Sequence, residues 1–269
     1  ALYPGRFFCI VMSDVWYQIR RRAGAAIARY RMINPGDRIM VCLSGGKDSA
    51  VLLRTLCLLQ KRSPVKFELG GAVFHPGFER FNIASIKKQA EECGIKLHIT
   101  GADIPLIIED KSAQDHPCML CSRLRRGALY SLAEKEGYNK LALGHHLDDL
   151  AVSFLISLFR GQGLTTMGPN VAAKEHALRI IRPLITTQES LISRAAATLE
   201  IDFSERCPYA GMLAESGDRA YFRRLMDELT QRIPDIREQM LNSLGSIQPD
   251  YLLDLRFLNL PAPAKGGSD

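Results

Sequence analysis

A short apolar run followed at once by a glycine-rich loop constrains the fold of this chain more than any other feature. Residues 38–43 read RIMVCL, and residues 44–49 read SGGKDS. The apolar run predicts a buried strand, and a helix is predicted over 48–60. A strand, a glycine loop and a helix in this order offer unpaired amide N–H groups and the positive end of a helix dipole, which together hold an anion. The loop therefore predicts a phosphate site in an α/β domain.

The rest of the chain repeats the alternation of strand and helix. A basic helix is predicted over 15–30, a polar stretch over 103–117 and a loop over 161–177. Further strands are predicted at 67–74, 95–100, 140–143 and 178–181, and further helices at 82–93, 122–136, 148–159, 188–199, 215–232 and 234–244. Such alternation predicts an α/β fold with a mostly parallel sheet, helices on both faces, and a helical C-terminal extension.

The same pattern divides the chain into four parts. Residues 1–36 are expected to form an N-terminal helical segment and 37–183 the α/β domain. Residues 184–255 form the helical extension, and 256–269, rich in Pro, Ala and Gly, form a flexible tail.

The chemistry of the glycine loop narrows the kind of phosphate site. Gly45 and Gly46 let the backbone approach an anion, Ser44 and Ser49 add hydroxyl donors, and Lys47 adds charge. The loop lacks the spacing of a Walker loop and that of a dinucleotide-binding loop. A glycine turn without a ligand is the alternative interpretation.

The pattern Ser-Gly-Gly-x-Asp-Ser at 44–49 resembles the fingerprint of the PP-loop ATP pyrophosphatase superfamily. The resemblance implies that the loop holds ATP phosphates and that a substrate oxygen attacks the α-phosphate while pyrophosphate leaves. Asp48 is then expected to help organise Mg²⁺, because a hard cation bridging phosphates needs carboxylate oxygen. The implied nucleotide-binding residues are Ser44, Gly45, Gly46, Lys47, Asp48 and Ser49.

Charge favours an anionic partner. The net charge is +6 and the pI is about 9.0, and arginines cluster at 20–22, 123–126, 179–182 and 219–224. RNA is the expected polyanion, although a solvated helix face explains about half of such clusters. No window has the apolar length of a membrane span, and the first residues do not resemble a secretion signal, so a cytoplasmic protein is expected.

Seven cysteines make a disulfide framework improbable for a chain of this length. Cys118 and Cys121 form a Cys-x-x-Cys at the start of a predicted helix, and Cys207 follows in the extension. Three thiolates can hold a 4Fe-4S cluster with one iron left open. A zinc site with His116 as fourth ligand and a catalytic cysteine pair stay open as alternatives. Three of the other cysteines, Cys42, Cys57 and Cys93, lie in apolar strand or helix segments that are typical of core residues.

A second polar signature, GHHLDD at 144–149, follows the strand predicted at 140–143. It is expected at the same rim of the sheet as the glycine loop, because the carboxyl ends of parallel strands share one edge. His145, Asp148 and Asp149 are candidates for contacts with ATP, Mg²⁺ or the target base. A polar helix N-terminus with Asp148 as cap is the structural alternative.

Taken together, the motifs resemble the tRNA 2-thiocytidine synthetase (TtcA) family over about residues 15–255. The resemblance implies an adenine nucleotide alpha hydrolase-like fold and ATP-dependent replacement of the C2 oxygen of a cytidine, at tRNA position 32, by sulfur. The runs that carry it are INPGDR at 33–38, CMLCSRLRRG at 118–127, LGHHLDD at 143–149 and IRPL at 181–184.

The resemblance also implies roles for individual residues and partners. Cys118, Cys121 and Cys207 would hold a 4Fe-4S cluster. Sulfur would come from a cysteine desulfurase, and a homodimer is compatible with the family. The catalytic residues expected are Asp48, His145, Asp148 and Asp149. Because Arg123, Arg125 and Arg126 lie next to the cysteines in sequence, they are expected to bind the RNA backbone, with pairing to acidic neighbours as the alternative.

Three positions differ from the family pattern. Residues 73–77, VFHPG, lack a carboxylate expected after the second strand, and Val152 stands where the family has a glutamate. The later cysteine pair keeps only Cys207. Alternatives therefore include thiolation of a free heterocycle or another nucleoside, an amine nucleophile with cysteines that bind zinc, and a nucleotide-binding or RNA-binding module without turnover.

Overall fold

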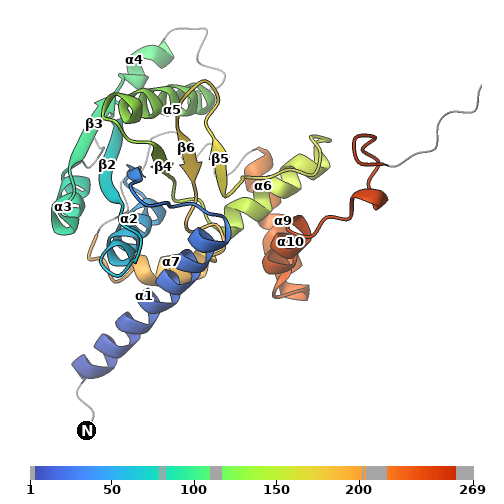
Figure 1. Ribbon diagram of the computed structural model, residues 1–269, viewed down its shortest axis with the longest axis horizontal. Coiled ribbons are helices and arrows are strands. Elements are labelled where there is room, and N and C mark those ends of the chain that lie inside the picture. Colours follow the sequence, from blue (N-terminus) through green and yellow to red (C-terminus); the bar gives the residue numbers. More distant parts are fainter. Residues whose placement is uncertain are drawn as a thin grey trace, which may run out of the picture.

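The computed structural model describes residues 4–78, 81, 83–109, 117–201, 203 and 217–258, with the backbone alone at 4–13, 108–109 and 117–119. Its centre is a six-stranded sheet with the order β3-β2-β1-β4-β6-β5 (Figure 1). Every neighbouring pair is parallel except β5 with β6. The strands are β1 Arg38–Leu43, β2 Glu68–His75, β3 Leu97–Gly101, β4 Lys140–Ala142, β5 Asn170–Ala172 and β6 Arg179–Ile181. The predicted mostly parallel α/β fold is confirmed.

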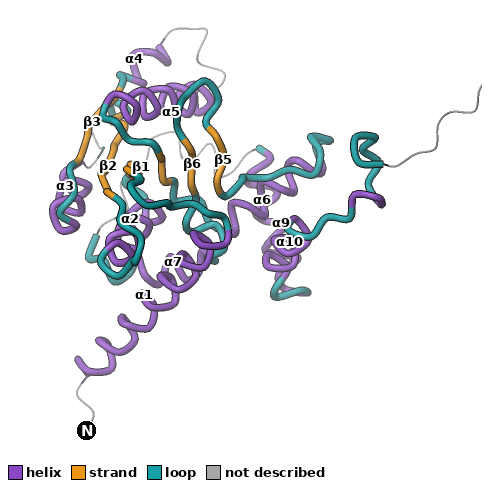
Figure 2. The backbone as a smooth tube through the Cα atoms, viewed as in Figure 1, coloured by secondary structure: helices purple, strands orange, loops and turns teal. Residues whose placement is uncertain are grey.

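Helices cover both faces of this sheet (Figure 2). The reason is visible in β1, whose residues alternate between the two faces. Ile39 and Val41 pack into a core with α1, α2, α3 and α7, whereas Met40 packs into a second core under α4 and α5. The helices are α1 Pro4–Arg29, α2 Lys47–Gln60, α3 Ile83–Cys93, α4 Ile104–Glu109, α5 Pro117–Lys135, α6 Leu147–Phe159 and α7 Glu189–Ala196.

Two C-terminal helices, α9 Asp218–Arg232 and α10 Ile236–Leu244, pack on α6 beside the main body, and a short 3₁₀ turn follows at Pro249–Tyr251 (Figure 1). A third apolar cluster joins Val152 and Leu155 of α6 to Phe222 and Met226 of α9. Because α6 begins at the rim of the sheet, this packing brings side chains of α9 and α10 to that rim.

Some elements differ from those predicted by the sequence. β5 lies within 161–177, predicted as loop, and α4 lies within 103–117, for which only a polar stretch was predicted. β5 has three residues and pairs only with β6, so it is too short to show a period-2 pattern. α1 begins well before residue 15. Within the described residues, no helix has the length and apolar character needed to cross a membrane.

Candidate active site

The glycine loop lies between β1 and α2 and presents free backbone donors. Gly45 has a φ of +82°, a left-handed conformation that glycine adopts without strain. Gly46 precedes α2 and makes no side-chain cap hydrogen bond. The Ser49 hydroxyl donates to the Gly46 carbonyl at 2.9 Å and accepts from the Ser44 amide at 3.2 Å. The first amides of α2 therefore stay available for an anion, and the loop shape is fixed by its own serines.

Lys47, the first residue of α2, is paired with two carboxylates. Its Nζ lies 2.9 Å from Asp48 Oδ1 and 2.7 Å from Glu189 Oε1, at the start of α7. Burial alone lowers the pKa of Lys47, but these two carboxylates outweigh it and hold the pKa above its ordinary value. Lys47 is therefore a fixed positive charge at the mouth of the loop.

His146 is the residue just before α6, in the segment that follows β4, and it contacts three carboxylates. It is 2% exposed, with Nε2 at 3.4 Å from Asp149 Oδ2 and 3.9 Å from Asp48 Oδ1, and Nδ1 at 3.6 Å from Asp148 Oδ2. Burial lowers the pKa of His146, but the charges of the carboxylates outweigh this effect and the pKa is raised. The His146 amide also donates to Asp149 Oδ2 at 3.2 Å, which caps α6.

His145 has a different environment from its neighbour. Arg182 Nε donates to His145 Nδ1 at 3.1 Å. Burial and the Arg182 charge lower the pKa of His145 to about 4, so the ring is neutral near pH 7. The structure thus brings His146, and not His145, into the group of carboxylates.

The C-terminal helices supply two arginines to the same rim. Arg237 of α10 places Nε 2.6 Å from Asp148 Oδ1, and Arg223 of α9 lies 3.6 Å from Glu189 Oε2 and 3.8 Å from Asp149 Oδ1. The Glu189 amide donates to Asp148 Oδ2 at 2.7 Å. Burial raises the pKa of Asp148, but His146, this amide and Arg237 together lower it below its usual range. Four acidic and four basic side chains thus meet beside the glycine loop.

This arrangement can hold a polyphosphate and a charged substrate in one place. The loop offers amides and Lys47, and Asp48 is the carboxylate next to them. No group of three or more His, Cys, Asp or Glu residues within the described chain forms a ready metal site. A divalent cation would therefore need phosphate oxygens in addition to protein carboxylates.

The cysteine motif lies at the start of α5. The Cys121 side chain is half-buried at the edge of the second core, with its sulfur 3.9 Å from Arg125 Nη2. Arg125 also acts on Cys42 in β1, whose pKa burial raises to about 12. Cys121 is therefore close to the strand that leads into the glycine loop. Cys118 lies three residues earlier in the same helix, and Cys207 and His116 lie outside the described residues.

The three arginines after the cysteine motif differ in their exposure to solvent. Arg123 and Arg126 are exposed, whereas Arg125 is half-buried and turned toward Cys121. Arg126 Nε donates to the Ser122 carbonyl at 3.4 Å. Arg123 and Arg126 are therefore available at the surface, while Arg125 belongs to the surroundings of the cysteines.

Comparison with known proteins places this chain in a family. Residues 17–209 match the family model of the PP-loop domain. A tRNA-cytidine(32) 2-sulfurtransferase from Geobacter sulfurreducens is 37% identical over 245 residues, which cover 90% of this chain and 95% of the relative. The chain belongs to the tRNA-cytidine(32) 2-sulfurtransferase family.

A second relative agrees with this family membership, and a solved structure agrees with the fold. The tRNA-cytidine(32) 2-sulfurtransferase from Citrifermentans bemidjiense is 32% identical over 263 residues, which cover 94% of this chain and 99% of the relative. The U34-tRNA thiolase NcsA from Methanococcus maripaludis, solved with its [4Fe-4S] cluster, superposes with a TM-score of 0.72 at 24% identity, covering 88% of this chain and 81% of that one. The family inferred from the motifs and the fold inferred from the alternation are both confirmed.

Several residues of this family member's site were not predicted from its sequence. Glu189, Arg223 and Arg237 come from helices far along the chain, and only the tertiary contacts bring them to Lys47, Asp149 and Asp148. The position of Glu189 near the start of a predicted helix was only a weak signal for a site residue, since acidic residues are common at helix N-termini. For Arg237, nothing in the spacing distinguishes it from other helix arginines.

The two histidines allow a test by pH. Protonated His146 stabilises the fold because its folded pKa is raised. This contribution is complete below the unfolded pKa of about 6.5 and is lost as pH rises through the folded pKa. We expect the loss of unfolding free energy in His146→Gln, measured by urea denaturation without ATP, to be largest at low pH and to shrink as pH rises.

The neighbouring histidine is the matched control. Because the pKa of His145 is lowered, its neutral ring favours folding, and the wild type loses stability as pH falls from about 6.5 toward 4. His145→Gln should therefore gain relative stability at low pH. A His146→Gln difference that grows with rising pH would contradict the geometry described for the carboxylates.

Proposed function

We propose that this protein replaces the C2 oxygen of cytidine 32 in tRNA with sulfur, using ATP. The observation that carries this proposal is the meeting of an anion-binding glycine loop with the His146 carboxylate group in a chain of the tRNA-cytidine(32) 2-sulfurtransferase family. The cytidine and its position come from the names of the relatives.

In the proposed reaction, the free amides at the start of α2 bind ATP phosphates, with Lys47 beside them. Mg²⁺ would be held by Asp48 and by the phosphates, because the described residues do not converge on a preformed cation site. Lys47 is then drawn toward phosphate oxygen and away from Glu189, and Arg223 lies close enough to keep Glu189 neutralised.

The chemical step joins the cytidine C2 oxygen to the α-phosphate of ATP, and the bond between the α- and β-phosphates breaks as pyrophosphate leaves. Sulfide then adds at C2, and the C–O bond breaks as AMP leaves. The cationic groups Lys47 and protonated His146 can offset the negative charge that develops on the phosphates. Asp148 and Asp149, which contact His146, hold its ring in position.

The surroundings of the cysteine motif suit an iron–sulfur cluster. Cys118 and Cys121 are three residues apart at the start of α5, where helix amides favour negative charge, and Arg125 places a positive charge beside the Cys121 sulfur. We infer that these two cysteines and Cys207 hold a [4Fe-4S] cluster, as NcsA does. A cluster held there would supply an open iron that binds sulfide.

The proposal includes partners outside the chain. The tRNA is the substrate, a cysteine desulfurase is the expected source of sulfur, and a homodimer is compatible with the family. Val152, where the resemblance implies a glutamate, packs in the apolar cluster between α6 and α9. Glu189 supplies a carboxylate at the rim, so the site does not lack acidic groups.

The test is production of the full chain in a bacterium that lacks 2-thiocytidine, followed by mass spectrometry of tRNA nucleosides. We expect 2-thiocytidine to appear, located at position 32 by sequencing of the modified fragment. Purified protein, ATP, Mg²⁺ and sulfide should reproduce it with one AMP formed per nucleoside. Formation of AMP without a thiolated nucleoside in tRNA would favour a free heterocycle or an amine nucleophile instead.

A further inference from the structure

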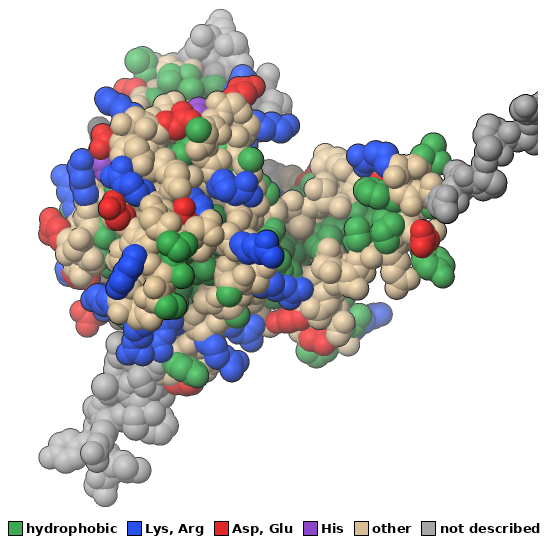
Figure 3. Space-filling model, in the orientation of Figure 1, with side chains coloured by type: hydrophobic (Ala, Val, Ile, Leu, Met, Phe, Trp, Pro, Cys, Tyr) green, Lys and Arg blue, Asp and Glu red, His purple; other side chains and the backbone are tan. Residues whose placement is uncertain are grey.

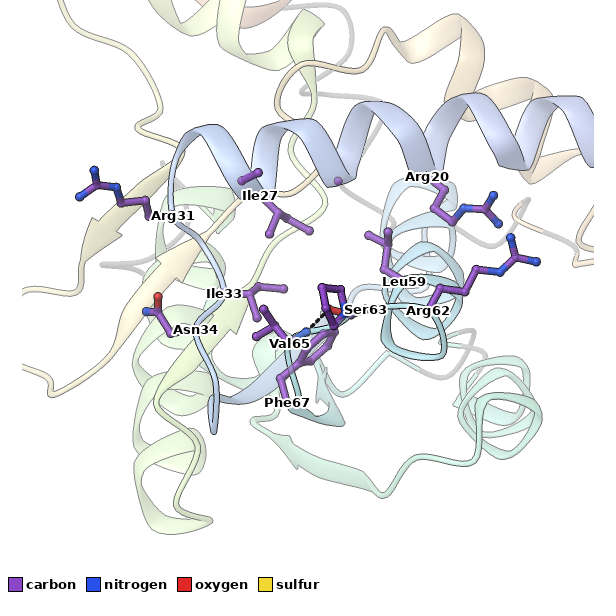
Figure 4. Close-up of a pocket in the computed structure, with 13 residues that line it drawn as sticks. Arg20, Ile27, Arg31, Ile33, Asn34, Leu59, Arg62, Ser63, Val65 and Phe67 are labelled. Atoms are coloured by element: carbon purple, nitrogen blue, oxygen red, sulfur yellow. Dashed lines mark hydrogen bonds between the residues drawn. The ribbon is translucent and has the colours of Figure 1, made fainter.

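A cavity of about 440 Å³ lies between α1, the end of α2 and the segment that leads into β2 (Figure 4). Its walls are apolar, formed mainly by Ile27, Ile33, Leu59, Val65 and Phe67. The cavity is within the size range of small-molecule sites. None of the residues placed in the active site above lines it.

Three arginines line the same cavity. Arg20 comes from α1, Arg31 from the turn after it and Arg62 from the turn after α2. Figure 4 shows the Arg20 and Arg62 side chains pointing the same way at one end of the cavity, with Arg31 at the other. Arg20 stacks on the Tyr17 ring at 5.7 Å. Within the described part of the chain, none of the three has a carboxylate partner, and no Asp or Glu lines the cavity.

The two chain segments that build the cavity carry only basic charges. Residues 15–36 and 49–67, which build it, contain nine Lys and Arg and no Asp or Glu, although the whole chain has 35 basic and 29 acidic residues. Figure 3 shows Lys and Arg side chains at the base of the globular body, where α1 leaves it. Such a surface suits a polyanion better than an isolated small acid.

Helix α2 extends from the active site to the cavity. Lys47 begins this helix at the glycine loop, and Leu59, twelve residues later, lines the cavity. At a rise of about 1.5 Å per residue, the two positions are roughly 18 Å apart. A folded RNA bound with one base at the glycine loop is long enough to reach the cavity.

We propose that the Arg-lined cavity is a second contact site for the RNA substrate and takes one unpaired nucleotide. The base enters between the apolar walls, and Arg20 and Arg62 hold the adjoining phosphates. Unstacked bases in RNA loops are commonly recognised in this way, by apolar or aromatic surfaces with arginine beside them. This inference rests on the proposed function, because it takes tRNA as the polyanion.

The test compares tRNA binding by the full chain with binding by variants that fill the cavity or remove its positive charges. Ala28→Trp fills the mouth from an exposed position, and Leu59→Trp fills the interior. Both should weaken the affinity for unmodified tRNA at least tenfold, with little change in the dependence of log K on log salt. Arg20→Ala/Arg62→Ala should weaken it similarly and reduce that slope by roughly 1.4, or about 0.7 per phosphate. The control is Lys87→Ala/Lys88→Ala, on exposed positions of α3.

The outcomes separate this inference from the proposed function. If the wild type thiolates tRNA and the cavity variants, including the exposed Ala28→Trp, bind tRNA within twofold of it, the cavity is not an RNA site. Unchanged tRNA binding with an altered sedimentation coefficient would assign the cavity to a second copy of the chain and also overturn the proposal. If the wild type neither binds nor thiolates tRNA, the proposed function itself fails. ATP affinity, measured on every variant, confirms that the fold is intact.

Discussion

Replacing Lys47 with alanine is expected to lower the rate of tRNA thiolation at least about 100-fold, since removal of one group that stabilises transition-state charge has costs of this size. Lys47 is the cation at the start of α2, and its Nζ is held 2.7 Å from Glu189 and 2.9 Å from Asp48. In the alanine variant, this cation no longer separates the ATP phosphates from the carboxylates of Asp48 and Glu189. The measurement is single-turnover formation of 2-thiocytidine and of AMP from saturating ATP.

Two variants serve as controls for this prediction. Lys87→Ala removes a cation from an exposed position of α3, outside both the glycine loop and the Arg-lined cavity, and should leave the AMP rate within about twofold. Lys47→Arg keeps the charge but not the compact ammonium, and should recover part of the rate. If Lys47→Ala formed AMP at the wild-type rate, the loop would not hold the reacting phosphates through this residue.

The second large effect is expected at the cysteines. Cys118→Ala, Cys121→Ala and Cys207→Ala should each abolish thiolation and remove most of the iron, about four atoms per chain in the anaerobically purified parent. ATP affinity should be unchanged in all three, because Ser44 to Ser49 do not depend on these thiols for their hydrogen bonds. Iron and sulfide analysis with absorbance spectra gives the first result, and nucleoside mass spectrometry the second.

Other cysteines in the chain provide the comparison. Cys57 and Cys93 lie in α2 and α3 and belong to the first core or pack against it, so their replacement by alanine should leave the iron content unchanged. A colourless protein that holds zinc would show that Cys118 and Cys121 serve a different site. A cluster that survives Cys207→Ala would remove that residue from the ligand set.

Much of the fold could be predicted from local pattern because the central strands are buried on both faces. β1 was predicted at its observed bounds, and the helix after the glycine loop within one residue of them. Short elements at the edge were not found, since β5 depends on its antiparallel pairing with β6 rather than on its own composition. The short helix α4 is likewise held in place by the packing of Ile104 in the second core.

The site shows the same division. The loop at 44–49 and the signature at 144–149 were recognised because each is a contiguous motif that follows a strand of the sheet. The sequence could not show which of His145 and His146 contacts the carboxylates, because the two residues are adjacent and differ only in their neighbours in space. His146 turns into three carboxylates, whereas His145 meets Arg182.

The sequence by itself indicated a parallel α/β core and a glycine loop suited to phosphate. It also indicated the family, whose members are named tRNA-cytidine(32) 2-sulfurtransferase. These features depend on residues that are close together in the chain. Only the tertiary structure decided which charges balance the site, since Glu189, Arg223 and Arg237 reach it from three different helices. Electrostatic interactions depend on distance and burial in space, and neither quantity is a function of separation along the chain.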